Sequence, residues 1–93
     1  MATATTIIRR GDLAYYESFA GMVPVKVLDQ ATHRTATGSV DGVIVRVTAD
    51  RGTYRRGEVM TAAEFAIVPR SHVRTRNGVQ YVVNHNYEIR WND

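Results

Sequence analysis

The chain of 93 residues contains no cysteine. Disulfides, thiolate metal ligands and a cysteine nucleophile are therefore excluded, and a hydrophobic core must supply the stability. No segment approaches the roughly 18 consecutive apolar residues of a membrane-spanning helix, and the first ten residues, MATATTIIRR, have no long apolar run. We therefore expect a soluble, cytoplasmic protein with no membrane contact, which folds alone or as a small homo-oligomer.

Lysine is almost as scarce as cysteine. Eleven arginines and a single lysine, Lys26, outnumber nine acidic residues and give a net charge of +3. This skew is typical of GC-rich genomes, such as those of actinobacteria and their phages, and we expect a source of that kind. Arginine also suits phosphate and carboxylate partners, because its planar guanidinium binds them through two hydrogen bonds. A charge this mild permits nucleic-acid binding without requiring it.

Patterns typical of catalytic or metal-binding sites are also lacking. The three histidines, His33, His72 and His85, lie far apart and in no ligand spacing. Ser71 and His72 are neighbours whose side chains tend to point apart, and the carboxylates form no paired motif. Residues 51–58, RGTYRRGE, lack the residue order of a phosphate-binding loop. We therefore expect a protein that is not an enzyme and has no cofactor or metal ion.

Valine, isoleucine, threonine and tyrosine recur at a spacing of two residues, which predicts β-strands over most of the chain. One strand, 59–68, is expected to bend irregularly near Glu64. Residues 29–41 lack apolar periodicity and predict a long loop or a protruding hairpin. The segments with the clearest alternation are 13–18, 22–28, 42–50 and 86–91. Residues 1–10 are expected to be a loosely ordered segment, followed by one domain over 11–93.

Two short motifs predict tight turns in the last third of the chain. Pro69 pushes the preceding residue toward an extended conformation, so a strand ends there and one 3₁₀ turn can form near residues 69–72. Asn77-Gly78 lies between two alternating runs and predicts a two-residue type I′ hairpin, because both central residues of that turn need positive φ.

The segments GDLAYYES, MVPVKVL, GVIVRVTA, GEVM and VPRSHV together resemble the SH3-like small β-barrels, including their Tudor and KOW-type relatives. In SH3 domains, I/V-P-x-x-Y-V makes the 3₁₀ turn before the last strand, and residues 68–73 are similar to it. Tudor and KOW-type barrels open their first strand with Gly-Asp, as Gly11-Asp12 does here. The resemblance covers roughly residues 11–76.

This resemblance implies an all-β fold, an SH3-like barrel of five or six antiparallel strands with an additional C-terminal hairpin arm. His72 stands where peptide-binding SH3 domains carry a tyrosine, and no paired tryptophans open a middle strand. Proline-rich peptides are therefore not expected as ligands.

The candidate binding surface combines arginines with tyrosines. In a two-residue hairpin, Arg74 pairs with Tyr81 and Arg76 with Val79, so that Arg74 can lie over the tyrosine ring. Nucleic acids and acidic proteins both favour such a surface. The candidate residues are Arg70, His72, Arg74, Arg76 and Tyr81 around the hairpin, and Arg51, Tyr54, Arg55 and Arg56 in an earlier turn. Alternatively, the arginines only keep a strand edge soluble and prevent edge-to-edge pairing.

These observations favour a protein-protein binding module that docks through an edge strand or through residues 29–41. If a phage encodes it, its partner is a host protein in the host cytoplasm, or it is a connector-type component of the virion. The alternative is a nucleic-acid-binding barrel of the KOW or Tudor type that uses Arg70, Arg74, Arg76 and Tyr81.

Overall fold

The computed structural model describes residues 4–83 and 87–91, and this part of the chain is all-β. Its strands are β1 (Ala4–Ile8), β2 (Leu13–Ser18), β3 (Gly21–Thr35), β4 (Gly38–Val47), β5 (Val59–Ala63), β6 (Ile67–Pro69), β7 (Val73–Arg76), β8 (Val79–Val82) and β9 (Tyr87–Trp91). Two 3₁₀ turns, η1 (Glu64–Ala66) and η2 (Arg70–His72), interrupt them. No helix in these residues is long and apolar enough to cross a bilayer.

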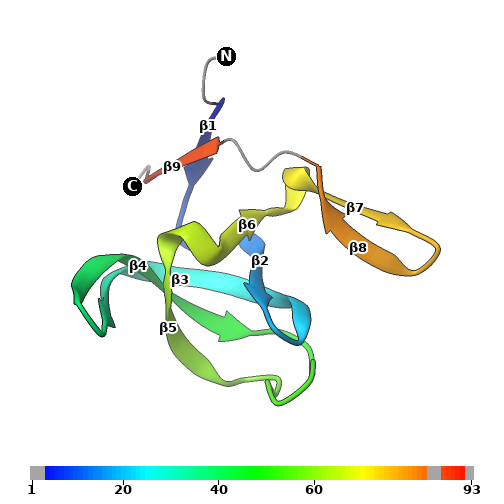
Figure 1. The fold of residues 1–93 in the computed structure, drawn as a ribbon, viewed down its shortest axis with the longest axis horizontal. Helices are drawn as coiled ribbons and strands as arrows, with labels where there is room; N and C mark the ends of the chain where they lie inside the picture. Colours follow the sequence, from blue (N-terminus) through cyan, green and yellow to red (C-terminus); the bar gives the residue numbers. More distant parts are fainter. Residues whose placement is uncertain (1–3, 84–86, 92–93) are drawn as a thin grey trace.

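Five strands form one antiparallel sheet in the order β5-β4-β3-β2-β6 (Figure 1). β5 and β6 lie on opposite edges of this sheet, although only the three residues of η1 separate them. Because a 3₁₀ turn advances only about 2 Å per residue, the sheet must curl until its two edges approach each other. The expected small barrel of five or six antiparallel strands is therefore confirmed, and its sheet has five.

A ladder of valines on β3 and β4 forms the centre of the core. Val25 pairs with Val47 and Val27 with Val45. Since side chains alternate between the two faces of a strand, these pairs share the face that curls inward. The valine ladder consists of Val23, Val25, Val27, Val43, Val45 and Val47, all of them buried. The two-residue spacing of these valines in the sequence places them on one face of each strand.

The β3–β4 hairpin continues beyond the barrel as an arm, on the left in Figure 1. Its register with β4 shifts at Leu28, and the extra residue of such a β-bulge bends the strand. At the base of the arm, a Cβ on Gly42 would lie 2.9 Å from the carbonyl oxygen of Ala62, so only glycine fits without a shift of the backbone. Of the two predicted forms of residues 29–41, the hairpin is confirmed.

The two ends of the described chain come together. β1 and β9 pair in parallel and lie beside the barrel (Figure 1). Ile8 and Ile89 extend the core from this pair, and Trp91 packs partly buried against it. Part of the segment expected to be loosely ordered is therefore the strand Ala4–Ile8, while residues 1–3 lie outside the described residues.

The β7–β8 hairpin projects from the opposite side of the molecule (Figure 1). Asn77 and Gly78 adopt φ values of 52° and 78°, as the predicted two-residue turn requires. The predicted register is also confirmed, with Arg74 opposite Tyr81 and Arg76 opposite Val79.

The predicted 3₁₀ turn forms at η2, but it has a different place in the barrel from the one that the SH3 resemblance implied. The last strand of the five-stranded sheet is β6, which pairs with β2 and ends at Pro69. Therefore η2 follows that strand and leads out to the β7–β8 hairpin, whereas η1 is the turn before it. The proline motif alone cannot distinguish these positions, because it specifies a turn after a strand and not the partner of the strand.

The valine ladder makes a direct prediction about stability. Val45→Ala should lower the free energy of unfolding by about 2–3 kcal/mol, because it removes two fully buried methyl groups and leaves a cavity. Val59→Ala makes the same chemical change at a side chain that is 53% exposed, and should cost less than about 1 kcal/mol. Urea denaturation measures both values, and equal costs would contradict the assignment of the core.

Candidate functional site

The two faces of the β7–β8 hairpin differ in exposure. Directly opposite residues of an antiparallel pair point to the same side, so Arg74, Arg76, Val79 and Tyr81 share one face, and all four are exposed. The other face carries Val73, Thr75, Gln80 and Val82. Gln80 and Val82 of this second face, together with Tyr81 of the first, line a hollow with Glu17 and Met22 of the β2–β3 turn region. Arg74 and Arg76 do not line this hollow.

Arg74 does not reach across to the ring of Tyr81 as expected. Its Nη1 donates hydrogen bonds to the carbonyl oxygens of Ser71, at 2.8 Å, and Val73, at 3.1 Å. Strand pairing brings two residues opposite each other, but a long side chain still turns toward the strongest acceptor within reach. Here these acceptors are carbonyl groups at the end of the η2 turn.

His72 was predicted as part of the binding surface, and the structure places it in an internal contact. Its side chain is half-buried, with its ring centroid 4.6 Å from that of Tyr87 on β9. Its Nε2 lies 3.3 Å from the Oγ1 of Thr6 on β1. The imidazole therefore joins the β1–β9 pair to the barrel, a contact between residues far apart in sequence.

Tyr87 completes this junction from the other side. Its hydroxyl donates a 2.9 Å hydrogen bond to the carbonyl oxygen of Ile67 in β6. Burial of the phenol raises the pKa of Tyr87 above its usual value of 10.0, and the negative charge of Glu17 raises it further. The sequence predicted the strand of Tyr87, but nothing in it indicated which carbonyl group the hydroxyl would bind.

The second predicted cluster does not extend the basic face of the hairpin. Nη2 of Arg51 donates a 3.2 Å hydrogen bond to Oε1 of Gln80, on the hairpin face opposite Arg74 and Arg76. Tyr54 is half-buried and meets Tyr16 edge-on, with ring centroids 5.7 Å apart. Two of the predicted residues therefore brace the fold.

Arg55 and Arg56 belong to the loop between β4 and β5. Nη1 of Arg55 donates to the carbonyl oxygen of Gly52, and the backbone N–H of Arg56 donates to the carboxylate of Asp50. Both side chains are exposed. Arg70, at the start of η2, is also exposed and lines a small hollow with Leu13 and Tyr15. The nine predicted residues therefore do not form one surface.

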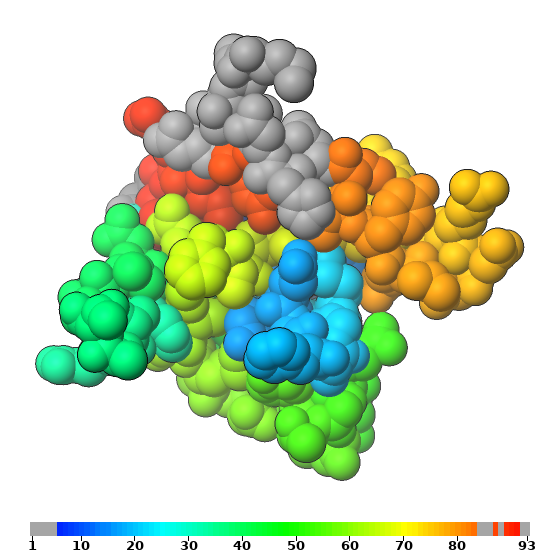
Figure 2. All heavy atoms as spheres, viewed as in Figure 1, coloured from blue at the N-terminus to red at the C-terminus, as the bar shows by residue number. Residues whose placement is uncertain are grey.

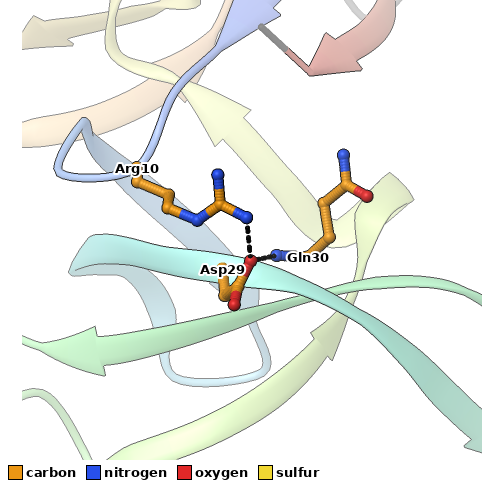
Figure 3. Close-up of polar contacts among 3 residues, drawn as sticks. All are labelled: Arg10, Asp29 and Gln30. Atoms are coloured by element: carbon orange, nitrogen blue, oxygen red, sulfur yellow. Dashed lines mark hydrogen bonds and ion pairs between the residues drawn. The ribbon is translucent and has the colours of Figure 1, made fainter. Parts of the chain in front are cut away.

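An exposed ion pair holds the base of the β3–β4 arm (Figure 3). Nη2 of Arg10 lies 2.7 Å from Oδ1 of Asp29, which also accepts the backbone N–H of Gln30 at 2.8 Å. The N–H of Gln30 is the main cause that holds the pKa of Asp29 below its usual value, and Arg10 adds to it. Ion pairs this exposed stabilise little, so the contact orients the arm more than it strengthens the fold.

Two phenylalanines that were not among the predicted binding residues are exposed. Phe19 lies fully in solvent in the β2–β3 turn, and Phe65 in η1 is 80% exposed. The two segments are close, because Tyr16 of β2 pairs with Ile67, directly after η1. Figure 2 shows both segments, blue and yellow-green, on the same face. We call these two residues the phenylalanine patch. A depression of about 290 Å³ beside Phe19 is walled by Tyr16 and Tyr54.

Two cations that were also not among the predicted binding residues lie on the outer face of the sheet. Lys26 of β3 and Arg46 of β4 are directly opposite each other and exposed. Each is the middle residue of a Val-Lys-Val or Val-Arg-Val triplet in a predicted strand. This repeated pattern was the available signal, but only the strand register shows that the two cations are neighbours.

The structure groups no three metal-ligating side chains within residues 4–83 and 87–91, and His85 lies outside these residues. Comparisons with protein-family models, with curated proteins and with solved structures found no match to this chain. Proposals about its function must therefore come from its own surfaces.

The Tyr87 junction predicts the effect of removing a single hydroxyl. Tyr87→Phe should lower the free energy of unfolding at pH 7 by about 1 kcal/mol, because the Ile67 carbonyl loses a partly buried donor. Tyr81→Phe, which removes an exposed hydroxyl, is the matched control and should change stability by less than about 0.5 kcal/mol. Urea denaturation followed by Trp91 fluorescence measures both, and equal effects would refute the assigned hydrogen bond.

The raised pKa of Tyr87 makes a separate prediction for alkaline solution. The phenol ionises more readily in the unfolded chain, so its stabilising contribution is complete below pH about 10 and is lost as the pH rises through the folded pKa. The wild-type protein should therefore lose stability more steeply above this pH than Tyr87→Phe does. Urea midpoints measured across the alkaline range test this, and parallel curves would contradict it.

Proposed function

We propose that this protein is a non-enzymatic binding module that docks on a partner protein through the phenylalanine patch. The observation that carries the proposal is the exposure of Phe19 and Phe65 on adjoining segments. Leaving two large aromatic side chains in water forgoes about 1.5–3 kcal/mol for each, compared with burial. Exposed aromatic anchors beside a depression are typical of the energetically dominant parts of protein interfaces.

The depression beside Phe19 suits a partner side chain. Tyr16 and Tyr54 form its wall, and their edge-on contact holds both rings in place. Glu17 lines the same depression, so a polar group is available at its margin. An apolar centre with a polar margin is the usual composition of such interfaces.

The composition of the sequence supports a proposal about the source of the protein. The strong preference for arginine over lysine suits a GC-rich source, and we propose a phage or its host. In a phage, the module would contact a host protein or serve as a connector-type subunit of the virion. The barrel with projecting hairpins on opposite sides supports either role, because it presents separate surfaces to separate neighbours.

The test is capture of the partner by purified protein, from a GC-rich host lysate and from virions. The double variant Phe19→Ser/Phe65→Ser should lose at least about tenfold in capture, because each anchor contributes on the order of 1–2 kcal/mol to binding. Both side chains are exposed, so thermal melting should show a folded variant.

Val79→Ser on the β7–β8 hairpin is the matched control, since it removes an apolar side chain that is 65% exposed at a different surface. It should capture the partner as the wild type does. No partner from either source, or loss of capture with Val79→Ser alone, would refute docking through the phenylalanine patch.

A further inference from the structure

A row of side chains crosses the outer face of the sheet at right angles to the strands. Lys26 pairs with Leu13 on one side and with Arg46 on the other, and Arg46 pairs with Val59. Paired residues point to the same face, and the neighbours of Lys26 along its strand belong to the buried valine ladder. The row therefore lies on the face away from the core, and all four of its side chains are exposed.

Arg70 continues this row at its other end. The last pair between β2 and β6 is Ala14 with Pro69, so the next residues, Leu13 and Arg70, lie side by side. Both line one small hollow of about 130 Å³ together with Tyr15. We call Lys26, Arg46 and Arg70 the cationic row. With strands about 4.8 Å apart, its backbone positions span about 14 Å from β4 to the end of β6.

Neither stabilisation of the sheet nor protection of a strand edge explains these cations. Like charges directly opposite each other destabilise a sheet, and in the described part of the chain neither the Lys26 side chain nor the Arg46 side chain has a hydrogen bond or ion pair. Cations that prevent aggregation belong on edge strands, whereas β3 and β4 are paired on both sides at this row. An anion bound between the two side chains would relieve this repulsion.

We propose that the cationic row binds the phosphate backbone of single-stranded nucleic acid. A repeating anion suits three cations along one line better than a single small anion does, and all three side chains are exposed. Leu13 lies between Lys26 and Arg70, and Tyr15 lies two residues farther along the same face of β2, so the two side chains offer apolar and aromatic contact to unpaired bases. An acidic protein is the alternative occupant, and the competition experiment below distinguishes it.

The test is fluorescence anisotropy of a labelled oligothymidylate of about 12 nucleotides, which lies within the range of known single-strand site sizes. The wild-type chain should bind at about 50 mM salt, with a slope of log affinity against log salt of about −2, as expected for three contacts at about 0.7 each. The double variant Lys26→Gln/Arg46→Gln should bind at least about tenfold more weakly, with the slope reduced by about 1.4.

The charge-matched control is Arg74→Gln/Arg76→Gln, which removes two cations from the hairpin face. It should keep its affinity within about twofold of the wild type. Arg70→Gln, a change outside the strands, should lower the slope by about 0.7 and provides a second test independent of strand stability. Thermal melting should show that Lys26→Gln/Arg46→Gln is at least as stable as the wild type at low salt, because the repulsion is gone.

Three results would overturn the proposal: no anisotropy change with the wild type, equal weakening by the two double variants, or competition by polyglutamate as effective as that by unlabelled oligothymidylate. The first would mean no site, the second a response to net charge alone, and the third a site that does not distinguish nucleic acid from acidic protein. Because Phe19→Ser/Phe65→Ser leaves the cationic row intact, it should bind the oligonucleotide normally. Failure of the protein-docking proposal would therefore be distinguishable from failure of this one.

Discussion

The pairing of valines across β3 and β4 is the constraint on which the other features depend. Because the side chains of each strand alternate, burying Val25, Val27, Val45 and Val47 sends Lys26 and Arg46 to the opposite face. A register slip of one residue would exchange the two sets, placing charges in the core, so the burial of the ladder also specifies the register. The same interaction that stabilises the barrel thus aligns the two cations.

The curled sheet places the exposed surfaces on different sides of the molecule. From β6 the chain continues through η2 to the projecting β7–β8 hairpin. His72 of η2 and Tyr87 of β9 are in contact there and hold the β1–β9 pair against the barrel. The phenylalanine patch lies on the β2–β3 turn and η1, where the barrel needs turns and leaves side chains in solvent. The proposed protein-docking patch and the proposed phosphate-binding row lie on different parts of one small domain, so the two proposals together describe a protein that brings a protein and a nucleic acid together.

Local patterns predicted those parts of the structure that neighbouring residues decide. The valine alternation, the Asn77-Gly78 turn with its register and the 3₁₀ turn after Pro69 all follow from backbone sterics and side-chain period over a few residues. The contacts of the surface residues were harder to predict. The turn that contains His72 and the strand that contains Arg74 were predicted correctly. However, His72 packs against Tyr87, and Arg74 donates to the carbonyl oxygens of Ser71 and Val73. Charge and aromaticity alone do not distinguish a solvent-facing side chain from one that braces a junction.

The sequence by itself determined the all-β class, the hairpin, the turns and the inward face of each central strand, because these depend on interactions within one or two strands. Only the tertiary structure decided the partners: which strand closes the barrel, that β1 joins β9 in parallel, and that Lys26, Arg46 and Arg70 form one row. The physical reason is that such contacts join residues far apart along the chain. Their geometry follows from how the whole sheet curls and not from any local preference.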